Sequence, residues 1–212
     1  MKICEIFTSI QGESTYAGLP CAFLRLTGCN LRCSYCDTKY AYDEGTDMSL
    51  KNIMDYVNKS GVKLVEITGG EPLIQGNETL ELLRRLLDEG YKVLIETNGS
   101  MSIKDVDKRA VIIMDVKTPS SGMSERMDFS NLDFIKKTDE VKFVICSRED
   151  YDWSKNIISS YRLIGRCEIL LSPAFNVLEP SLLSRWIIED KLDVRLNLQI
   201  HKYIFGPGER AV

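Results

Sequence analysis

The sequence contains a single histidine, His201, and no long apolar run. None of its apolar stretches approaches the roughly 18 uninterrupted residues that a membrane span needs. Its first residues, MKICEIFTSIQGES, also lack the long apolar core of a signal peptide. These absences argue against a membrane-embedded or secreted protein, and we expect a cytoplasmic protein without a membrane partner.

The sequence also has no excess of basic residues. Lys and Arg together number 27 and Asp and Glu together number 31, which gives a formal net charge of -4. Nucleic-acid binding usually requires a basic face, so we expect no nucleic-acid partner, whereas a small anionic ligand held by a few cations stays compatible. Repeats, low-complexity tracts and a separating linker are also absent. We therefore expect one domain over residues 1–212, long enough for a substantial core.

Cysteine is the one unusual residue that is well represented, with seven copies. In a reducing cytoplasm these are expected to be thiols, metal ligands or catalysts rather than disulfides. Four of them lie singly in apolar, strand-like segments, where we expect small buried hydrophobic residues; these are Cys4, Cys21, Cys146 and Cys167. The other three lie close together among polar residues and need a separate explanation.

Apolar strands and amphipathic helices alternate along the chain. Strands are predicted at 22–28, 62–70, 91–99, 110–118, 140–146, 167–173 and 194–200. Helices are predicted at 49–61, 77–90, 130–138, 151–163 and 179–191, with a short polar helix between residues 99 and 110. Ser49 and Asn77 are expected as N-caps of the first two helices, which Gly61 and Gly90 should end. This alternation is typical of a parallel sheet covered by helices.

Polar and glycine-rich clusters follow nearly every predicted strand at its C-terminal end. They read GCNLRCSYCDT, TGGEP, ETNG, DVKTPSSG, SPAFN and HKYIF. A single shared mouth explains this arrangement, as in a barrel whose active site lies on its C-terminal face, but the chain is shorter than the roughly 250 residues of a full eightfold barrel. We therefore predict an α/β fold: a partial (open) TIM-like barrel of about six to seven mainly parallel strands with outer helices.

The segment LTGCNLRCSYCDTKY, residues 26–40, carries Cys29, Cys33 and Cys36 with the spacing C-x3-C-x2-C. Tetrahedral zinc usually takes four ligands, so a zinc site would need His201 or Cys21 as well. A thioredoxin-like pair would use only two of the three thiols. A 4Fe-4S cluster held by three thiolates leaves one iron without a protein ligand, and an external amino acid could chelate that iron.

The cysteine motif directly after the first barrel strand resembles that of radical S-adenosylmethionine enzymes. Tyr35 matches the aromatic residue that usually precedes the last cysteine of that motif, and TGGEP (Thr68–Pro72) resembles the family's glycine-rich loop. Glycine allows the backbone there to approach a ligand closely. The resemblance implies a 4Fe-4S cluster held by Cys29, Cys33 and Cys36, with S-adenosylmethionine on the fourth iron. It also implies reductive cleavage of that cofactor to a 5′-deoxyadenosyl radical.

Flanking segments narrow the resemblance. EIFTSIQGES, LPCAFLRLTGCNLRCSYCDT, ETNG, DVKTPSSG and QIHK together resemble the 7-carboxy-7-deazaguanine synthase family, from about residue 5 to about residue 202. The resemblance implies a lyase that converts the pterin substrate 6-carboxy-5,6,7,8-tetrahydropterin into 7-carboxy-7-deazaguanine with loss of ammonia, on the route to the 7-deazapurine tRNA bases queuosine and archaeosine. It further implies Mg2+, an electron donor such as flavodoxin or ferredoxin, and a homodimer.

The same resemblance assigns roles to individual residues. Thr38 aligns with the magnesium ligand, and a hard cation prefers such oxygen ligands. The residues aligned with S-adenosylmethionine contacts are Tyr35, Cys36, Asp37, Gly70, Asp115, Val116, Lys117, Ser172, Pro173, Ala174 and Phe175. Those aligned with substrate contacts are Ile10, Gln11, Gly12, Arg25 and Thr68, with Glu13 and Glu96 as further substrate-facing residues. The Gln11 amide both donates and accepts, and Arg25 suits a carboxylate.

Some features fall outside this pattern. DVK stands where many relatives carry Ser-Pro-Lys, and the tail YIFGPGERAV continues past HK. His201 is expected to be a structural residue after the last strand. A glycyl-radical-enzyme activating enzyme shares the cysteine motif but has no evident need for IQGES or Arg25. A non-enzymatic metal-binding module is the third alternative, and its metal content would distinguish it from the other two.

Overall fold

The computed structural model describes residues 1–212 and contains one nine-stranded sheet with the order β3-β1-β2-β4-β5-β6-β7-β8-β9. The strands are β1 (Lys2–Ile10), β2 (Pro20–Leu26), β3 (Thr46–Asp47), β4 (Leu64–Gly69), β5 (Lys92–Thr97), β6 (Val111–Val116), β7 (Glu140–Ile145), β8 (Glu168–Pro173) and β9 (Arg195–Leu196). Neighbours from β2 to β9 pair in parallel, whereas β1 pairs antiparallel with both β2 and β3. Because the edge strands β3 and β9 do not pair with each other, the barrel is open, as predicted.

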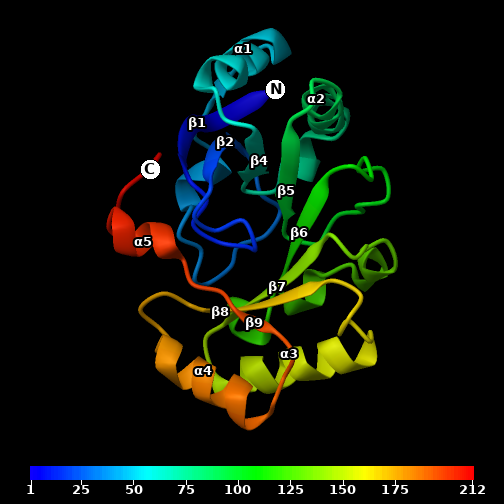
Figure 1. The fold of residues 1–212 in the computed structure, drawn as a ribbon, viewed down its shortest axis with the longest axis vertical. Helices are drawn as coiled ribbons and strands as arrows, with labels where there is room; N and C mark the ends of the chain where they lie inside the picture. Colours follow the sequence, from blue (N-terminus) through cyan, green and yellow to red (C-terminus); the bar gives the residue numbers. More distant parts are fainter.

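Four of the five α-helices lie outside the curved sheet, and the short last one lies at the rim of the barrel mouth. They are α1 (Leu50–Ser60), α2 (Asn77–Asp88), α3 (Arg148–Ser160), α4 (Pro180–Glu189) and α5 (Ile200–Ile204). Figure 1 shows α1 and α2 beside the first half of the sheet and α3 and α4 at the opposite end of the molecule, with α5 on the side away from β6. None of the helices combines the length and the apolarity that a membrane span requires.

Five short 3-10 helices complete the secondary structure. They are η1 (Lys39–Tyr42), η2 (Pro72–Gln75), η3 (Pro119–Ser121), η4 (Ser124–Arg126) and η5 (Phe129–Asp133). Two of them follow the segments that the sequence marks as functional, since η1 comes after the cysteine loop and η2 begins inside TGGEP. The loops at the mouth of the barrel therefore have regular hydrogen-bonded turns.

The two faces of the sheet have different cores. A cluster of 34 buried residues fills the space between the sheet and the outer helices. A second cluster of seven lies on the inner face and includes Phe7 and Phe23, whose rings stack with centroids 4.9 Å apart. Side chains alternate between faces along a strand, so Ile67 packs outward while Glu66 and Thr68 point inward. Each parallel strand thus supports the core and lines the barrel interior at once.

Helix ends follow the sequence in α1 and partly in α2. Ser49 accepts a hydrogen bond from the Asn52 backbone N–H, and Gly61 ends α1 in the left-handed region with φ +72°. The N-cap of α2 is Gly76 rather than Asn77, which is the first helical residue and makes no capping bond. The prediction of Asn77 as N-cap was wrong because η2 runs directly into α2. Gly90 follows the last turn of α2 with φ +82°, as expected.

Three predicted elements differ from the structure, in each case because side chains or a new turn satisfy the backbone. The helix at 130–138 is only the short η5, since the Asn131 amide donates to the carbonyls of Gly99 and Met101. Turns replace the polar helix between residues 99 and 110, where Asp107 accepts from the Arg109 N–H. The strand at 194–200 is reduced to β9, after which the chain turns into α5.

The four isolated cysteines are only partly as predicted. All seven cysteines are free thiols. Cys21 is fully buried on the inner face of β2, which confirms the expectation for that residue. Cys4, Cys146 and Cys167 are half-buried, because the first lies near the edge of the sheet and the other two lie just outside β7 and β8. The expectation of a buried residue was therefore wrong for these three.

Candidate active site

A cavity of about 420 Å³ opens at the C-terminal ends of the parallel strands. It is lined by the three loop cysteines and by every other residue that the sequence pointed to, with one exception. The exception is Val116, whose side chain packs into the outer core because it alternates with Asp115 and Lys117 along the end of β6. The fold therefore brings the predicted site residues together in one cavity, although they lie far apart in the sequence.

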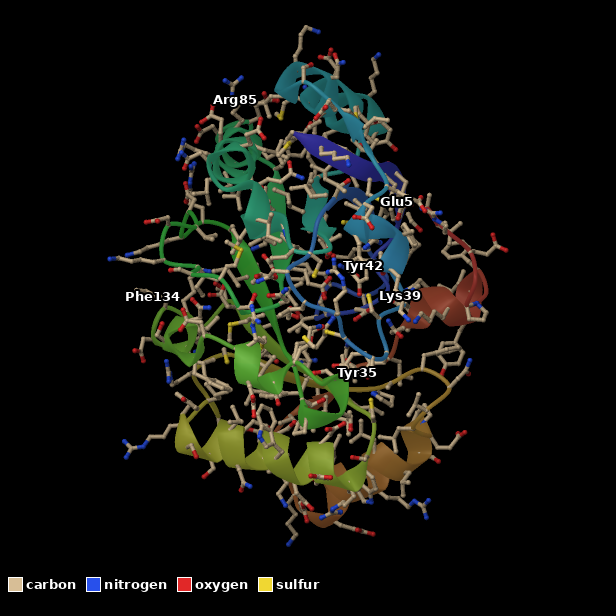
Figure 2. The ribbon with its side chains drawn as sticks, turned by 180° about the vertical axis from the view of Figure 1, so that it is seen from behind. Glu5, Tyr35, Lys39, Tyr42, Arg85 and Phe134 are labelled. Carbon is tan, nitrogen blue, oxygen red and sulfur yellow. The ribbon has the colours of Figure 1, made fainter.

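The cysteine loop connects β2 to η1 and is held by contacts of its own. Arg32 donates to the carbonyl oxygens of Cys29 at 2.8 Å and Leu31 at 2.7 Å, and its guanidinium lies 4.1 Å from the ring centroid of Tyr42. Figure 2 shows Tyr42 and Tyr35 toward the middle of the molecule, whereas Arg85 and Phe134 lie on its outside. These contacts hold the loop in place.

The sulfur of Cys29 accepts two weak hydrogen bonds. They come from the Leu31 N–H at 3.5 Å and the Asn98 side-chain amide at 3.8 Å. Burial raises the pKa of the Cys29 and Cys33 thiols. Thiolate is the form that binds iron, so a bound cluster would reverse this effect by stabilising the ionised sulfur. Three free thiols on one cavity wall fit a cluster with one iron left open.

A closed zinc site finds no support in this arrangement. No group of three or more His, Cys, Asp or Glu side chains gathers closely enough to hold one metal ion. The buried Cys21 faces the apolar floor, and His201 lies in α5 beside Gly12. The thiolates of a 4Fe-4S cluster bind different irons and therefore stand farther apart than ligands of a single ion.

The TGGEP segment packs against the cysteine loop through its backbone. A Cβ at Gly70 would lie 2.7 Å from the Cβ of Cys29, so only glycine allows the two loops to approach this closely. The Glu71 N–H donates to the Gly28 carbonyl at 2.7 Å. The buried Glu71 carboxylate accepts from the backbone N–H of Leu73 and Asn98, which ties the loops after β4 and β5 together. This cradle fits a ligand amino or carboxylate group at its surface.

The wall opposite this cradle comes from β6 and β8. Asp115 and Lys117 form an ion pair of 2.8 Å, and the second Asp115 oxygen is buried without a hydrogen-bond partner. Burial opposes ionisation of Asp115, but the ammonium groups of Lys117 and Lys142 lower its pKa. Ser172 is also buried on this wall. An unpaired buried oxygen beside polar side chains fits a ligand with hydrogen-bond donors, as S-adenosylmethionine has.

A buried lysine that the sequence did not single out lies at the centre of the cavity. Lys142 on β7 is 5% exposed, and its ammonium bonds Glu13 at 3.0 Å, lies 3.5 Å from Asp115, and also bonds Glu96. Burial alone would lower the pKa of Lys142, but the carboxylates of Glu13 and Glu96 raise it well above its usual range. The signal was a lysine within the apolar strand sequence EVKFVIC. Lys142 neutralises acids that could not otherwise be buried together.

Above the apolar floor, the residues expected to face the substrate form pairs. Arg25 donates from Nε to Glu5 at 2.7 Å, and Tyr40 donates to the same oxygen at 3.0 Å. The terminal guanidinium nitrogens of Arg25 make no hydrogen bond within the protein. Thr68 donates to Glu96 at 3.0 Å. The cavity thus presents a free pair of donors at Arg25 above a network of acids.

Glu66 and the side-chain amide of Gln11 form a further pair on the inner face. The sequence predicted Gln11 as a site residue but not Glu66. Gln11 donates to Glu66, and both side chains are almost fully buried. Burial raises the pKa of Glu66 well above its usual range, and the carboxylates of Glu96 and Glu13 add to this effect. Glu66 was missed because it lies in the apolar strand sequence LVEIT, where only its alternation with Ile67 indicates the inner face.

The rim near the cysteine loop includes residues of α5. Thr38 donates to Asp37 at 2.9 Å, and Lys202 donates to the other Asp37 oxygen at 2.6 Å. Although burial acts in the opposite direction, the Lys202 ammonium lowers the pKa of Asp37 to about 2. His201 lines the cavity with its ring against Gly12, where a Cβ would come within 2.7 Å of the imidazole carbon Cγ. His201 therefore lies in the cavity wall and not simply behind a strand.

Comparison with known proteins identifies the class. The Radical SAM superfamily matches residues 24–137, which is more than half of the chain. A crystal structure of QueE from Escherichia coli superposes with a TM-score of 0.78 at 23% identity, covering 93% of each chain, and shows the same fold. The open barrel and its cysteine loop are those of a radical S-adenosylmethionine protein.

Sequence relatives identify the family within that class. A 7-carboxy-7-deazaguanine synthase from Chlorobaculum tepidum is 45% identical over all of this chain and 97% of its own length. One from Koribacter versatilis is 43% identical over the full length of both proteins. The chain belongs to the 7-carboxy-7-deazaguanine synthase family, which confirms the resemblance found in the sequence.

Proposed function

We propose that the protein is a radical S-adenosylmethionine lyase that converts 6-carboxy-5,6,7,8-tetrahydropterin into 7-carboxy-7-deazaguanine and ammonia. The observation that carries this proposal is the joining of the cysteine loop, the TGGEP cradle and the Arg25–Thr68 wall in one cavity. The product and ammonia together contain all the atoms of the substrate, so the overall reaction needs no net oxidant. Full-length family membership supports this assignment.

In this proposal Cys29, Cys33 and Cys36 hold the 4Fe-4S cluster, and Gly70, Asp115 and Ser172 are among the residues that bind S-adenosylmethionine. When bound, these groups supply an electron and a 5′-deoxyadenosyl radical that removes a hydrogen atom from the substrate. Gly70 leaves room for the methionine amino group, and Asp115 lines the same cavity with one oxygen that no protein donor satisfies. The protein's part is to hold the substrate carbon near the cysteine loop and to exclude water.

Arg25 is suited to orient the substrate. Its Nε is already bound to Glu5, so the guanidinium is held in one position with two terminal donors free. A carboxylate on these donors would lie directly beneath the cysteine loop, because Arg25 is the second-last residue of β2. The carbon that bears the carboxylate would then be the atom nearest to the radical source. The six-membered ring that contains it contracts, and ammonia leaves.

Mg2+ is a separate part of the proposal. The Thr38 hydroxyl lies on the cavity wall next to the Asp37 carboxylate. Mg2+ is usually held by few protein oxygens and keeps positions for substrate and water. A single hydroxyl is therefore compatible with such a site, with the substrate supplying further oxygen ligands.

The partner predictions also belong to this proposal. We infer a low-potential electron donor such as flavodoxin or ferredoxin, a homodimer, and a cytoplasmic location that provides the reducing conditions an exposed cluster needs. Residues 1–212 would form one functional domain because the sheet and the cavity include residues from both ends of the chain.

Anaerobic reconstitution and turnover test the assignment. We expect brown protein with about four irons per chain, because the three cysteine thiolates would hold one 4Fe-4S cluster. With S-adenosylmethionine, Mg2+ and dithionite it should convert 6-carboxytetrahydropterin into the deazaguanine acid. Colourless protein with one zinc ion would contradict the radical assignment. Cleavage of S-adenosylmethionine without pterin turnover would instead favour an activating enzyme.

Substitution of Arg25 tests the orientation of the substrate. Arg25→Ala should raise the KM for the pterin at least about tenfold, because a charge-assisted hydrogen bond contributes roughly 1.5–3 kcal/mol. Cluster content and uncoupled cleavage of S-adenosylmethionine should stay near wild-type levels. A matched control is Arg84→Ala on the exposed face of α2, which should change neither value. Loss of the cluster in Arg25→Ala would contradict the role given to this residue.

A further inference from the structure

Glu66 has no assigned role, although it lies at the centre of the cavity. Its side chain points inward from β4, one inner position below Thr68, and the residue is 4% exposed. The strand register pairs Arg25 with Thr68 and Phe23 with Glu66. The inner face therefore has an upper level of Arg25 and Thr68 and, one step deeper, a level that contains Glu66 above the apolar floor.

Glu66 differs from the other acids that line the cavity because it has no cationic partner. Glu13 and Glu96 pair with Lys142, Asp115 pairs with Lys117, and Asp37 pairs with Lys202. No ion pair includes Glu66, and the aromatic ring of Phe23 lies beside it in the register. A buried carboxyl group without a cation is costly unless it remains protonated or a ligand satisfies it.

The hydrogen bonds of Glu66 leave one oxygen available. Its Oε2 accepts from the Gln11 side-chain amide, while Oε1 makes no hydrogen bond. The side-chain oxygen Oε1 of Gln11 accepts from the Glu13 N–H at 2.8 Å, which fixes the orientation of the Gln11 amide. Gln11 therefore always presents an N–H to Glu66. The free Oε1 is not among the fully enclosed polar atoms without a partner, so a ligand in the cavity can reach it.

The shape of the substrate decides which group meets Glu66. In 6-carboxytetrahydropterin the carboxylate and the pyrimidine edge lie at opposite ends of two fused rings. With the carboxylate at Arg25, the rings extend away from the cysteine loop toward the deeper level. Two residues along a strand span about 6.6 Å, close to the length of this bicycle. The edge that reaches Glu66 carries two N–H donors, N3–H and the 2-amino group.

We propose that Glu66 binds the N3–H and 2-amino edge of the pterin and so selects 2-amino over 2-oxo pteridines. This inference rests on the proposed function and deepens it. A carboxylate accepts from two adjacent N–H donors, whereas a 2-oxo group would place its lone pairs against the carboxylate oxygen. The product has the same pyrimidine edge, so Glu66 would hold an end of the molecule that does not change while the other ring contracts.

The charges around Glu66 are consistent with this role. Burial raises its pKa, and the nearby carboxylates of Glu96 and Glu13 raise it further, whereas Lys142 and Arg25 act in the opposite direction. Two N–H donors from the ligand would stabilise the ionised form of Glu66, which has no cationic partner within the protein. Glu96 and Glu13 are less suited to this edge because both of their oxygens already accept hydrogen bonds from the protein.

A change of ligand preference tests the proposal. In Glu66→Gln, the new amide would turn its oxygen toward the Gln11 N–H and its NH2 toward the ligand. We expect binding of 6-carboxypterin to reconstituted enzyme with S-adenosylmethionine to weaken by at least about tenfold, because a donor then faces donors. Binding of 6-carboxylumazine, which has a 2-oxo group, should strengthen. Fluorescence titration of both compounds against wild type and variant measures the ratio.

Two further variants make the result decisive. Glu140→Gln changes another buried inner acid, which binds Thr15 and does not line the cavity, and it should leave the preference unchanged. If Glu66→Gln does not fold, Glu66→Asp keeps the carboxylate but withdraws it by one methylene, and it should weaken pterin binding while keeping the 2-amino preference.

The possible outcomes separate this inference from the proposed function. Equal loss of affinity for both compounds in folded, cluster-loaded Glu66→Gln would show a merely structural role and overturn the inference. An unchanged preference in Glu66→Gln, or unaffected pterin binding in Glu66→Asp, would also overturn it. If the wild type turns over the pterin, these results leave the proposed function intact. If the wild type neither binds nor converts the pterin, the proposed function itself fails.

Discussion

Gly70 is the residue at which the two loops of the cavity come into contact. A Cβ at this position would meet the Cβ of Cys29 and the backbone of Gly28 at 2.7 Å, so alanine must displace the cysteine loop. We expect Gly70→Ala to lower iron retention after reconstitution and to reduce the free energy of unfolding by roughly 1–3 kcal/mol, as overpacking does. Iron analysis and urea unfolding measure both effects.

Gly208 provides the matched control for this substitution. It has an ordinary negative φ, and no atom lies within 4 Å of a Cβ placed there. Gly208→Ala should therefore leave iron content and stability unchanged. Equal behaviour of the two variants would show that the close approach at Gly70 is not required.

The raised pKa of Glu66 predicts a pH dependence of stability. Folding takes up a proton between the ordinary value of 4.5 and the higher folded-state pKa, because burial disfavours the charged carboxylate. The free energy of unfolding of the wild type should therefore fall as pH rises through this window. Glu66→Gln lacks that proton and should not share the fall. Urea unfolding from pH 4.5 to pH 8 measures the difference, and parallel curves for the two proteins would contradict it.

At the level of single residues, the sequence predicted the loops of the site better than the side chains inside the barrel. The spacing of Cys29, Cys33 and Cys36 and the glycines of TGGEP are local patterns that chemistry constrains directly. Glu66 and Lys142 are single charges within apolar strands, and their meaning depends on which face of the sheet is inside. That face is set by the closure of the whole sheet, which no local pattern contains.

Among the elements, long periodic segments were predictable and short ones were not. The strands β2 and β4 to β8 and the helices α1 to α4 follow from apolar runs and helical spacing. η5 replaced a predicted helix because Asn131 bonds three backbone groups of residues 99–103. β9 is short because the Asn197 side chain turns to Ser172, and α5 then begins. Tertiary hydrogen bonds thus override local preference at the ends of the fold.

The N-termini of α1 and α2 give a test at the level of secondary-structure elements. Ser49→Ala removes the bond to the Asn52 N–H and should lower the free energy of unfolding by about 1 kcal/mol. Asn77→Ala should change it by only a few tenths of a kcal/mol, because Asn77 is the first helical residue of α2 and caps nothing. Urea unfolding of both variants measures this contrast. A larger loss in Asn77→Ala than in Ser49→Ala would reverse the assignment of the caps.

For the whole molecule, the barrel interior depends on a balance of charge. Glu13, Glu96 and Asp115 come from three different elements and share the ammonium of Lys142. The ordinary net charge of the chain conceals this concentration of acids. The same balance positions the acids around the proposed substrate site, so stability and binding depend on one buried group.

Removal of that ammonium should be costly. Lys142→Met leaves the acids without their shared cation and should lower the free energy of unfolding by about 3–5 kcal/mol, the usual cost of breaking a buried pair. The loss should be smaller at pH 5 than at pH 8, because the acids then take up protons more easily. Urea unfolding at both pH values measures it.

A second substitution separates charge balance from packing. Lys142→Met combined with Glu96→Gln should recover part of the lost stability, because one uncompensated charge is removed with its volume kept. Lys137→Met is the control, since Lys137 is exposed and forms no ion pair, and it should stay within about 0.5 kcal/mol of wild type. No recovery in the double variant would show that packing dominates.

The contact between α5 and the loop after β1 has a consequence for synthesis of the chain. The Ile200 N–H donates to the Gly12 carbonyl at 2.8 Å, and Lys202 reaches Asp37, so residues near the C-terminus complete the wall around the cysteine loop. A ribosome releases that loop long before it releases α5. We therefore expect the three thiols to be more accessible to iron and sulfide in a chain that still lacks α5 than in the finished protein.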